Sequence, residues 1–362
     1  MKKIKTLFNI YHLYYLPQFL PVIKEMEKNP IFDIYFSAYI DNYNIEITLI
    51  KNVLKYHDNK FISAKTEKER IANIKKAEFD VIIFGKSSYA EKYCIPKTLA
   101  VLLYHGIGIK SCYYTDYNSR INVRYIEGEY RKNEFIRRGV DTDIAITGFP
   151  KLDVMFEANK SFKNKLNLDK NKKTILYTPT FYPSSIEVFG ESLVTQTEEY
   201  NLLIKLHHFS WTMKKYQHQN KLYKELSDKY SHISLLPVEF TNSAELYNLS
   251  DVLLTEASST VFEYLSTGNP VIICDFVHLR LKHRLFPFSI NKRMDMEIQK
   301  QLDFAYKLKK PSKLSYLLQK VLLERINRLL LIQKRKDEIL GKVDGRASQR
   351  VVKDILRRIN AR

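Results

Sequence analysis

The sequence predicts an α/β protein with two parallel sheets, and three observations support this fold class. Short runs of β-branched and aromatic residues recur along the chain, and each is followed by a longer segment whose apolar residues have helical spacing. Several runs are almost continuously apolar, which is typical of strands buried on both faces of a parallel sheet. Eleven such runs are many for one doubly wound sheet, so we expect two such units.

The expected strands fall into two series, one in each half of the chain. The first series lies at 5–10, 32–38, 80–84, 101–104, 123–126 and 143–147, and the second at 174–177, 202–206, 232–236, 252–255 and 271–274. The charged, Asn-rich stretch 158–173 separates the two series. We therefore expect an N-terminal domain at 1–157 and a C-terminal domain at 158–362.

The last part of the chain combines positive charge with a helical apolar pattern. Residues 301–362 hold 17 Lys and Arg against 6 Asp and Glu, a net charge of +11. Leucines and other apolar residues recur at three-four spacing from Leu314 to Leu330, which predicts one amphipathic stripe, and a last helix is expected near 347–359. These helices either pack on the core or present a basic amphipathic surface to anionic lipid.

Composition excludes several classes of protein. An apolar content of 45% with 13% aromatic residues excludes a disordered or collagen-like chain. The three cysteines, Cys94, Cys112 and Cys274, have no short spacing, which excludes a disulfide scaffold and a CxxC site and favours a reducing compartment. The sequence has no run of about 18 uncharged apolar residues and no signal-peptide cleavage site, so we expect a cytoplasmic protein.

The formal net charge is +19, and its concentration in residues 301–362 indicates a partner rich in negative charge. A nucleic acid, an anionic lipid and a polyphosphate compound all meet that description. The alternative is a solvated surface of a Lys-rich protein. Because the sequence contains no RRM, KH or zinc-finger pattern, we expect no nucleic-acid partner.

One candidate site follows the expected strand 101–104. Ligands of open parallel sheets bind beyond the carboxyl ends of the strands, and Gly106 and Gly108 would let backbone amides approach a ligand there. His105 can move a proton near neutral pH, and Lys110 can face a phosphate. The structural alternative is a histidine that only supports the end of the strand.

A second candidate site lies at the end of the strand 202–206. Adjacent side chains of a strand point to opposite faces, so Lys205 and His207 share one face and His208 takes the other. A lysine and a histidine on one face suit a phosphate or a leaving group. Their spacing does not suit a metal ion.

The third candidate site is the segment 251–263, where a strand leads into small hydroxyl residues and then into a helix that begins near Ser259. The free N–H groups of that helix end attract anions, and Ser258 and Ser259 add hydroxyl donors. Glu263 lies one turn further, where its carboxylate can accept from ribose hydroxyls. Simple N-capping by Ser258 or Ser259 is the structural alternative.

Six motifs, in this order, resemble the family of CDP-glycerol glycerophosphotransferases, the polymerases and primases of teichoic acids and related capsules. The resemblance runs from about Tyr104 to Arg350. The motifs are HGxxxK at 105–110, GFPKxD at 148–153, ILYxPTF at 175–181, KxH at 205–207, the segment 251–263 and DGxASxR at 344–350. Each motif alone is weak, and their shared order makes the resemblance specific.

The resemblance implies a GT-B fold, in which two Rossmann-like domains face each other, the first on the acceptor side and the second on the CDP side. It implies that His105 and His207 are the catalytic pair, and we expect no metal or cofactor. Asp116 and Asp153 are the next candidates for the proton acceptor. The residues implied around the CDP substrate are Gly106, Lys110, Lys151, Thr180, Phe181, Lys205, Ser258, Ser259 and Glu263.

The resemblance also implies a reaction. Glycerol phosphate would pass from CDP-glycerol to a hydroxyl of a cell-surface glycan or lipid-linked acceptor, with release of CMP, at the inner face of the cell membrane. Ile107-Gly108 and Glu256-Ala257 stand where the family usually has Thr-Pro and Asp-Tyr, so CDP-ribitol or another CDP-polyol stays open. The alternative is a GT-B glycosyltransferase that uses a UDP- or CMP-sugar.

Overall fold

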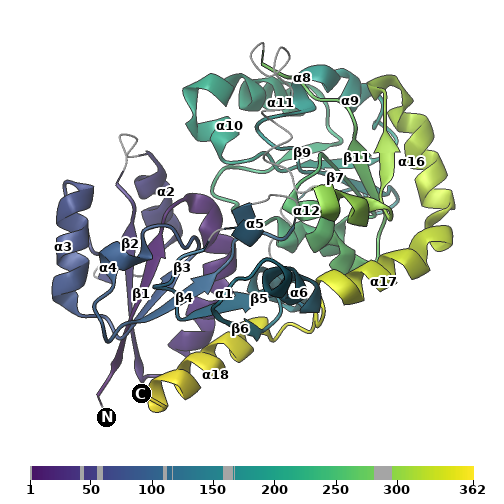
Figure 1. The fold of residues 1–362 in the computed structure, drawn as a ribbon. Coiled ribbons are helices and arrows are strands. Elements are labelled where there is room, and N and C mark those ends of the chain that lie inside the picture. Colours follow the sequence, from purple (N-terminus) through teal and green to yellow (C-terminus); the bar gives the residue numbers. More distant parts are fainter. Residues whose placement is uncertain are drawn as a thin grey trace. The chain divides into compact units, whose positions relative to one another are not determined.

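A computed structural model describes the chain over residues 2–40, 45–54, 60–108, 112–115, 117–157, 166, 168–280 and 296–362. The chain divides into two compact units (Figure 1). The first unit comprises Met1–Gly106, Cys112–Phe156 and Gly341–Arg362, and the second comprises Ile107–Ser111 and Glu157–Leu340. The end of the chain thus belongs to the first unit, whereas the sequence analysis placed all of 158–362 in the second.

The first unit is built on a six-stranded sheet in which every neighbouring pair is parallel. Its strands are β1 (Ile4–Ile10), β2 (Phe32–Ala38), β3 (Val81–Phe84), β4 (Leu99–Leu103), β5 (Val123–Ile126) and β6 (Asp143–Ile146). They lie in the order β2-β1-β3-β4-β5-β6. The chain turns to one side of β1 for β2 and to the other side for β3, so the topological switch point lies between β1 and β3.

The second unit carries a six-stranded parallel sheet of its own. Its strands are β7 (Thr174–Tyr177), β8 (Asn201–Ile204), β9 (Ile233–Leu235), β10 (Val252–Thr255), β11 (Val271–Cys274) and β12 (Tyr306–Leu308). The order β12-β11-β10-β7-β8-β9 puts the switch point between β7 and β10. All eleven expected strands are confirmed. The sequence analysis missed β12, a three-residue edge strand with an exposed lysine at its centre.

Helices complete both units (Figure 1). The α-helices of the first unit are α1 (Leu16–Glu27), α2 (Ile45–Val53), α3 (Glu67–Ala77), α4 (Ala90–Tyr93), α5 (Cys112–Thr115), α6 (Glu129–Arg137) and α18 (Ala347–Asn360). Those of the second are α8 (Ile186–Phe189), α9 (Ser192–Thr195), α10 (Phe209–Thr212), α11 (Gln217–Lys229), α12 (Ser259–Glu263), α15 (Met296–Gln299), α16 (Leu314–Leu323) and α17 (Leu329–Ile339). Short 3-10 helices include η1 (Leu13–Tyr15), η3 (Pro150–Phe156), η6 (Tyr264–Thr267) and η9 (Arg325–Arg328).

Burial on both faces explains why the strands are so apolar. The central strands β3, β4, β7 and β10 are buried along their whole length. A side chain that faces a helix layer on either side of the sheet has no water contact, so apolar residues stabilise both faces. The polar residues needed for a site therefore gather where these strands end.

The predicted apolar stripe of the tail divides between two environments. Helices α16 and α17 are separated by η9, so the stripe does not continue on one straight helix. Leu314 and Leu318 are fully buried, whereas Ile326 and Leu330 are 80% and 86% exposed. Among the described residues, no helix is long and apolar enough to cross a bilayer. The last expected helix is present as α18.

Candidate active site

Three of the predicted site segments follow adjacent strands of the second sheet. Thr180 and Phe181 follow β7, Lys205 and His207 follow β8, and Ser258 follows β10. Parallel neighbours end at the same edge, so these segments meet there, and two of them flank the switch point between β7 and β10. The predicted strand ends are confirmed, and the binding of a substrate there stays a prediction.

Hydroxyl groups join the segments after β7 and β10. Thr178 Oγ1 lies 3.3 Å from Thr260 Oγ1, and Thr260 Oγ1 lies 2.6 Å from Ser258 Oγ. Thr255 Oγ1 donates to the Thr178 carbonyl at 2.7 Å. Ser258 occupies the N-cap position of α12, but its side chain makes no capping hydrogen bond. The N-capping alternative for Ser258 is therefore wrong. Helix α12 begins at Ser259, as predicted, and continues for five residues before η6.

Glu256 fixes the loop after β7. Its carboxylate accepts hydrogen bonds from the Thr180 N–H at 2.7 Å, the Ser185 N–H at 2.6 Å and the Ser185 hydroxyl at 2.6 Å. The side chain is buried, and burial raises its pKa above the ordinary value. Glu256 thus determines where Thr180 and Phe181 lie. At this departure from the usual family motif, the carboxylate is therefore bound to the loop after β7.

His207 lies beside the aromatic ring that this loop presents. The ring centroids of His207 and Phe181 are 4.7 Å apart. The Phe209 N–H donates to His207 Nδ1 at 3.2 Å, so the proton of the neutral imidazole lies on Nε2. Lys205 and His207 are half-buried and His208 is buried. The predicted placement of the two histidines on opposite faces of a strand is wrong, because β8 ends at Ile204 and the His207 and His208 ring centroids lie 4.5 Å apart. Lys205 Nζ donates to the Leu206 carbonyl at 3.0 Å.

Glu263 is buried and has a tyrosine partner within the second unit. Its side chain is fully buried, and its carboxylate accepts from the Tyr247 hydroxyl at 2.8 Å. The distance between the Glu263 carboxylate and a bound ribose depends on how the substrate binds at the edge of the second sheet. The ribose contact of Glu263 stays a prediction.

His105 follows β4 of the first sheet and is held by backbone and aromatic groups. Its Nδ1 lies 3.3 Å from the Gly85 carbonyl oxygen, and because a carbonyl only accepts, Nδ1 carries the proton. Nε2 is then an acceptor, 3.3 Å from the Tyr113 hydroxyl. The Tyr14 and Tyr15 rings lie against the imidazole, each at 4.7 Å between centroids.

Gly85 and Arg131 help to hold His105 in its position. A Cβ on Gly85 would lie 2.6 Å from the Tyr15 ring, so only glycine lets its carbonyl reach His105 while Tyr15 stays in place. Arg131 is fully buried, forms an ion pair with Glu127 at 2.9 Å and donates to the Gly106 carbonyl at 2.8 Å. The buried ion pair thereby fixes the backbone next to His105.

Gly106 and Gly108, which follow His105, both have structural roles. Gly106 offers its carbonyl to Arg131. Gly108, which belongs to the second unit, has a φ of +87°, and a Cβ there would lie 2.5 Å from the Phe262 ring of the same unit. This crowding explains why glycine stands at this departure from the usual family motif. Lys110 and Asp116 lie outside the described residues.

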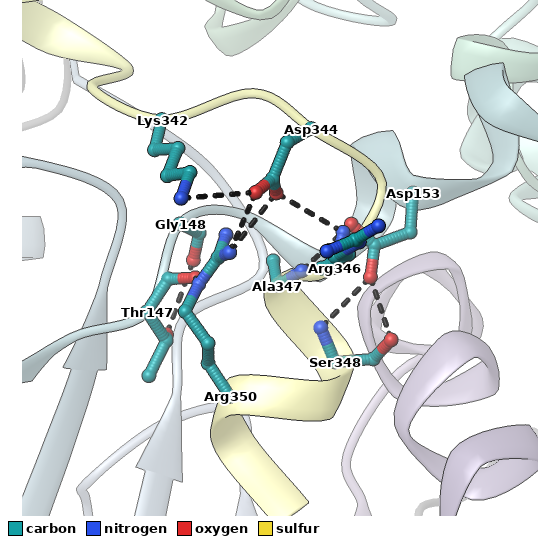
Figure 2. A network of polar contacts seen from close by, with 9 residues as sticks. All are labelled: Thr147, Gly148, Asp153, Lys342, Asp344, Arg346, Ala347, Ser348 and Arg350. Carbon is teal, nitrogen blue, oxygen red and sulfur yellow. Dashed lines mark hydrogen bonds and ion pairs between the residues drawn. The ribbon is translucent and has the colours of Figure 1, made fainter.

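The motifs at 148–153 and 344–350 form a structural contact within the first unit, which we call the C-terminal clasp (Figure 2). Asp153 accepts from the Ala347 N–H at 3.0 Å, the Ser348 N–H at 2.8 Å and the Ser348 hydroxyl at 2.6 Å, and so caps α18. Arg350 donates to the Thr147 carbonyl at 2.7 Å and to both oxygens of Asp344 at 3.0 Å.

The structure changes the interpretation of Asp153 and leaves that of Lys151 open to test. Asp153 was a candidate proton acceptor, but its carboxylate oxygens are engaged by three donors of α18, so that hypothesis is wrong. Lys151 is 8% exposed, and its backbone N–H donates to Gln18 at 2.8 Å. Its predicted place near the phosphates stays untested.

The residues that position His105 were not predicted from the sequence. Gly85, Tyr113 and the Glu127–Arg131 pair have no spacing relative to His105 that marks them in the chain. The one sequence feature that could have marked Glu127 and Arg131 is their i, i+4 spacing near the start of a helix. Because such pairs are common on solvent-exposed helices, this spacing does not identify a buried pair. Within the described ranges, no group of three or more His, Cys, Asp or Glu side chains is arranged to hold a metal ion.

Comparison with known families gives one match that covers more than half of the chain. The sequence model described as CDP-Glycerol:Poly(glycerophosphate) glycerophosphotransferase matches residues 136–357. That range contains the segments after β7, β8 and β10 and the C-terminal clasp. It does not contain His105.

Individual relatives agree with this match. The teichoic acid poly(ribitol-phosphate) polymerase of Bacillus spizizenii is 28% identical over 235 residues, which cover 60% of this chain and 34% of the relative. The chain spans about a third of the length of the curated relatives it matches.

Solved structures show the fold. The wall teichoic acid polymerase TagF has a TM-score of 0.70 at 18% identity, over 99% of this chain and 89% of that one. A putative UDP-N-acetylglucosamine 2-epimerase from Listeria monocytogenes has a TM-score of 0.65 at 13% identity, over 100% and 98%. With the two parallel sheets, these likenesses confirm the predicted GT-B fold.

Proposed function

Because this chain belongs to the CDP-glycerol:poly(glycerophosphate) glycerophosphotransferase family, we propose that it transfers glycerol phosphate or another polyol phosphate from a CDP-activated substrate. The acceptor is a hydroxyl of a glycan or a lipid-linked chain, and CMP is released. The observation that carries the proposal is the set of segments after β7, β8 and β10, which gathers Thr180, Lys205, His207 and Ser258 at one sheet edge.

The proposed reaction is a displacement at phosphorus. The acceptor oxygen forms a bond to the β-phosphorus of the CDP-polyol, and the bond from that phosphorus to the oxygen of CMP breaks. The acceptor loses its proton, and the leaving phosphate of CMP takes up negative charge. Positioning and charge stabilisation provide most of the rate enhancement in reactions of this kind.

The hydrogen bonds of the two histidines support different tasks. His105 carries its proton on Nδ1, so Nε2 is the acceptor nitrogen that a general base needs, and it lies 3.3 Å from the Tyr113 hydroxyl. His207 carries its proton on Nε2 and is suited to donate a hydrogen bond to a phosphate oxygen. We therefore assign proton abstraction to His105 and charge stabilisation to His207.

The remaining contacts with the CDP substrate follow from the same edge. Ser258 and Ser259 offer hydroxyl groups to the diphosphate, Lys205 offers positive charge, and Phe181 offers a ring face to the base or ribose. Thr180, whose hydroxyl donates to the Pro183 carbonyl, is retained as a predicted contact. Gly106, Lys110, Lys151 and Glu263 are retained as predicted contacts.

The substrate class is tested by incubating the purified chain with a lipid-linked glycerol phosphate acceptor and one activated compound at a time. CDP-glycerol, CDP-ribitol and UDP-N-acetylglucosamine are compared, and released CMP or UDP is measured. We expect CMP from at least one CDP-polyol. Release of UDP alone would favour the glycosyltransferase alternative.

We also propose that the turn between α16 and α17 attaches the protein to the inner face of the cell membrane. Leu323, Ile326 and Leu330 are 85%, 80% and 86% exposed, and Lys320 and Arg325 beside them are exposed as well. Apolar side chains can enter the lipid boundary while each cation near an anionic surface contributes about 1 kcal/mol.

The membrane proposal is tested by sedimentation with vesicles. Binding to phosphatidylglycerol vesicles should exceed binding to phosphatidylcholine vesicles and should fall as salt is raised. Ile326→Glu should reduce it, whereas Ile136→Glu, at a 63% exposed position of the first unit, should not. Equal binding to both vesicle types, or equal loss in both variants, would reject this assignment.

A further inference from the structure

The switch point of the first sheet carries a row of aromatic side chains that leads to His105. The row consists of Tyr39, Tyr11, His12 and Tyr14, which follow β2 and β1 in the chain. All four are half-buried, so each presents part of its surface to solvent. Ligands of open α/β sheets bind beyond the strand ends at the switch point, which here lies between β1 and β3.

Ring contacts connect the members of the row. The Tyr39 and Tyr11 rings stack at 4.2 Å between centroids with an interplanar angle of 21°. His12 lies 5.0 Å from Tyr11 and 5.0 Å from Tyr14. Tyr14 in turn lies 4.7 Å from His105. The row is therefore one continuous aromatic surface from the end of β2 to the proposed base.

A cation stands at the switch point itself. Lys86, which follows β3, places Nζ 4.2 Å from the centroid of the Tyr11 ring. Among the described residues no carboxylate pairs with Lys86, which distinguishes it from Lys60, whose Nζ lies over Tyr35 but is bound to Asp33 at 2.8 Å. The Lys86 charge is thus available to an anion.

A buried network fixes the backbone beneath the row. Arg70 is 1% exposed, binds both carboxylate oxygens of Glu67 and reaches Asn9 at 2.7 Å and Ser37 at 3.1 Å. Asn9 and Ser37 are the last polar residues of β1 and β2. The strand ends that carry the row are therefore preorganised, which reduces the entropy lost when a ligand binds.

Resting on the function proposed above, we propose that this row and Lys86 bind the acceptor chain as a polyol-phosphate oligomer. The solvent-exposed surfaces of the tyrosine rings contact the carbon skeleton of a polyol, while their hydroxyls bond its hydroxyls. Lys86 binds a phosphate that precedes the last unit. The terminal hydroxyl then lies at His105, where the row ends.

The test is direct binding of a synthetic glycerol phosphate oligomer to the full chain by calorimetry, without the CDP substrate. Lys86→Met should weaken binding about tenfold, because it removes a charge-assisted contact. Tyr11→Leu should weaken it about threefold to tenfold, and Tyr11→Phe should retain most of it because the ring remains. Lys60→Met is the matched control and should bind like the unmodified chain.

The outcomes separate this inference from the proposed function. Unchanged oligomer affinity in Lys86→Met and Tyr11→Leu, or equal affinity for an oligoglycerol without phosphates, would overturn the acceptor assignment. CDP-glycerol affinity is measured in parallel and should be unaffected by all four variants. Weakened oligomer binding together with no CMP release by the unmodified chain would uphold the row as a polyol-phosphate site and reject the transferase.

Discussion

The switch points of the two sheets are built in opposite ways. In the second unit, the buried carboxylate of Glu256 binds Thr180 and Ser185 and joins the loops after β10 and β7. In the first unit, Tyr11 and Lys86 meet at the equivalent position and both are half-exposed. In the second unit, Glu256 thus fixes the loop at the switch point. In the first unit, Arg70 fixes the ends of β1 and β2, while Tyr11 and Lys86 keep part of their surface exposed to solvent.

The histidines differ in a corresponding way. His105 donates through Nδ1 to a carbonyl, and His207 accepts through Nδ1 from an N–H group. One backbone contact in each unit therefore selects opposite tautomers. We propose on this basis that His105 acts as the base and that His207 donates to a phosphate oxygen.

The largest expected effect concerns the buried pair behind His105. Arg131→Met leaves Glu127 buried without its partner and should lower the free energy of unfolding by about 3–5 kcal/mol, measured by urea denaturation. Arg137→Met, on the same helix but 57% exposed, should cost no more than about 1 kcal/mol. Replacing Glu127 with Leu in the Arg131→Met variant should recover most of the loss. Equal costs for the two single variants would show that the first unit does not depend on this pair.

Glu256→Gln tests the contacts that fix the loop at the switch point of the second unit. The carboxylate of Glu256 accepts from two backbone N–H groups, and the NH₂ group of glutamine cannot accept. One N–H would therefore lose its acceptor, which should lower the free energy of unfolding by about 1–3 kcal/mol. The loop that carries Thr180 and Phe181 should loosen, and CDP-glycerol affinity should fall about tenfold by calorimetry. Glu191→Gln, in the same unit and 50% exposed, is the control and should leave the affinity unchanged. Normal affinity in Glu256→Gln would remove Glu256 from the support of the site.

Asp153→Ala should have the smallest effect and should be confined to the clasp. Loss of the cap should cost about 1–2 kcal/mol and speed amide hydrogen exchange in the first turn of α18. The value of kcat should stay close to that of the unmodified chain. A fall in kcat of about a hundredfold or more would return Asp153 to the list of proton acceptors.

Most of the fold follows from the sequence because strands buried on both faces leave an unmistakable apolar pattern. The strand β12 escaped because Tyr306–Leu308 is short and centred on an exposed lysine. The tail stripe was read as continuous because spacing alone does not reveal that η9 interrupts it.

The candidate site was less accessible from the sequence. Motif order led to His105, Lys205, His207 and Ser258, which lie at strand ends. The partners that decide their chemistry depend on tertiary structure, since the Gly85 carbonyl comes from a different strand than His105. Asp153 shows the same limit, because its partners on α18 are more than 190 residues away in the chain.

The opposite tautomers are tested most directly by replacing each histidine with Ala and with Gln. Gln retains an N–H donor near the position of Nε2 but cannot accept a proton. His105→Ala and His105→Gln should both lower kcat by about 10²–10⁴ with CDP-glycerol affinity kept. His207→Gln should bind CDP-glycerol about tenfold more tightly than His207→Ala, because it restores a hydrogen bond to a charged oxygen. His208→Ala, at the buried neighbouring position, should affect stability more than kcat. Recovery of kcat in His105→Gln, or equal affinities for the two His207 variants, would contradict the division of tasks between the two units.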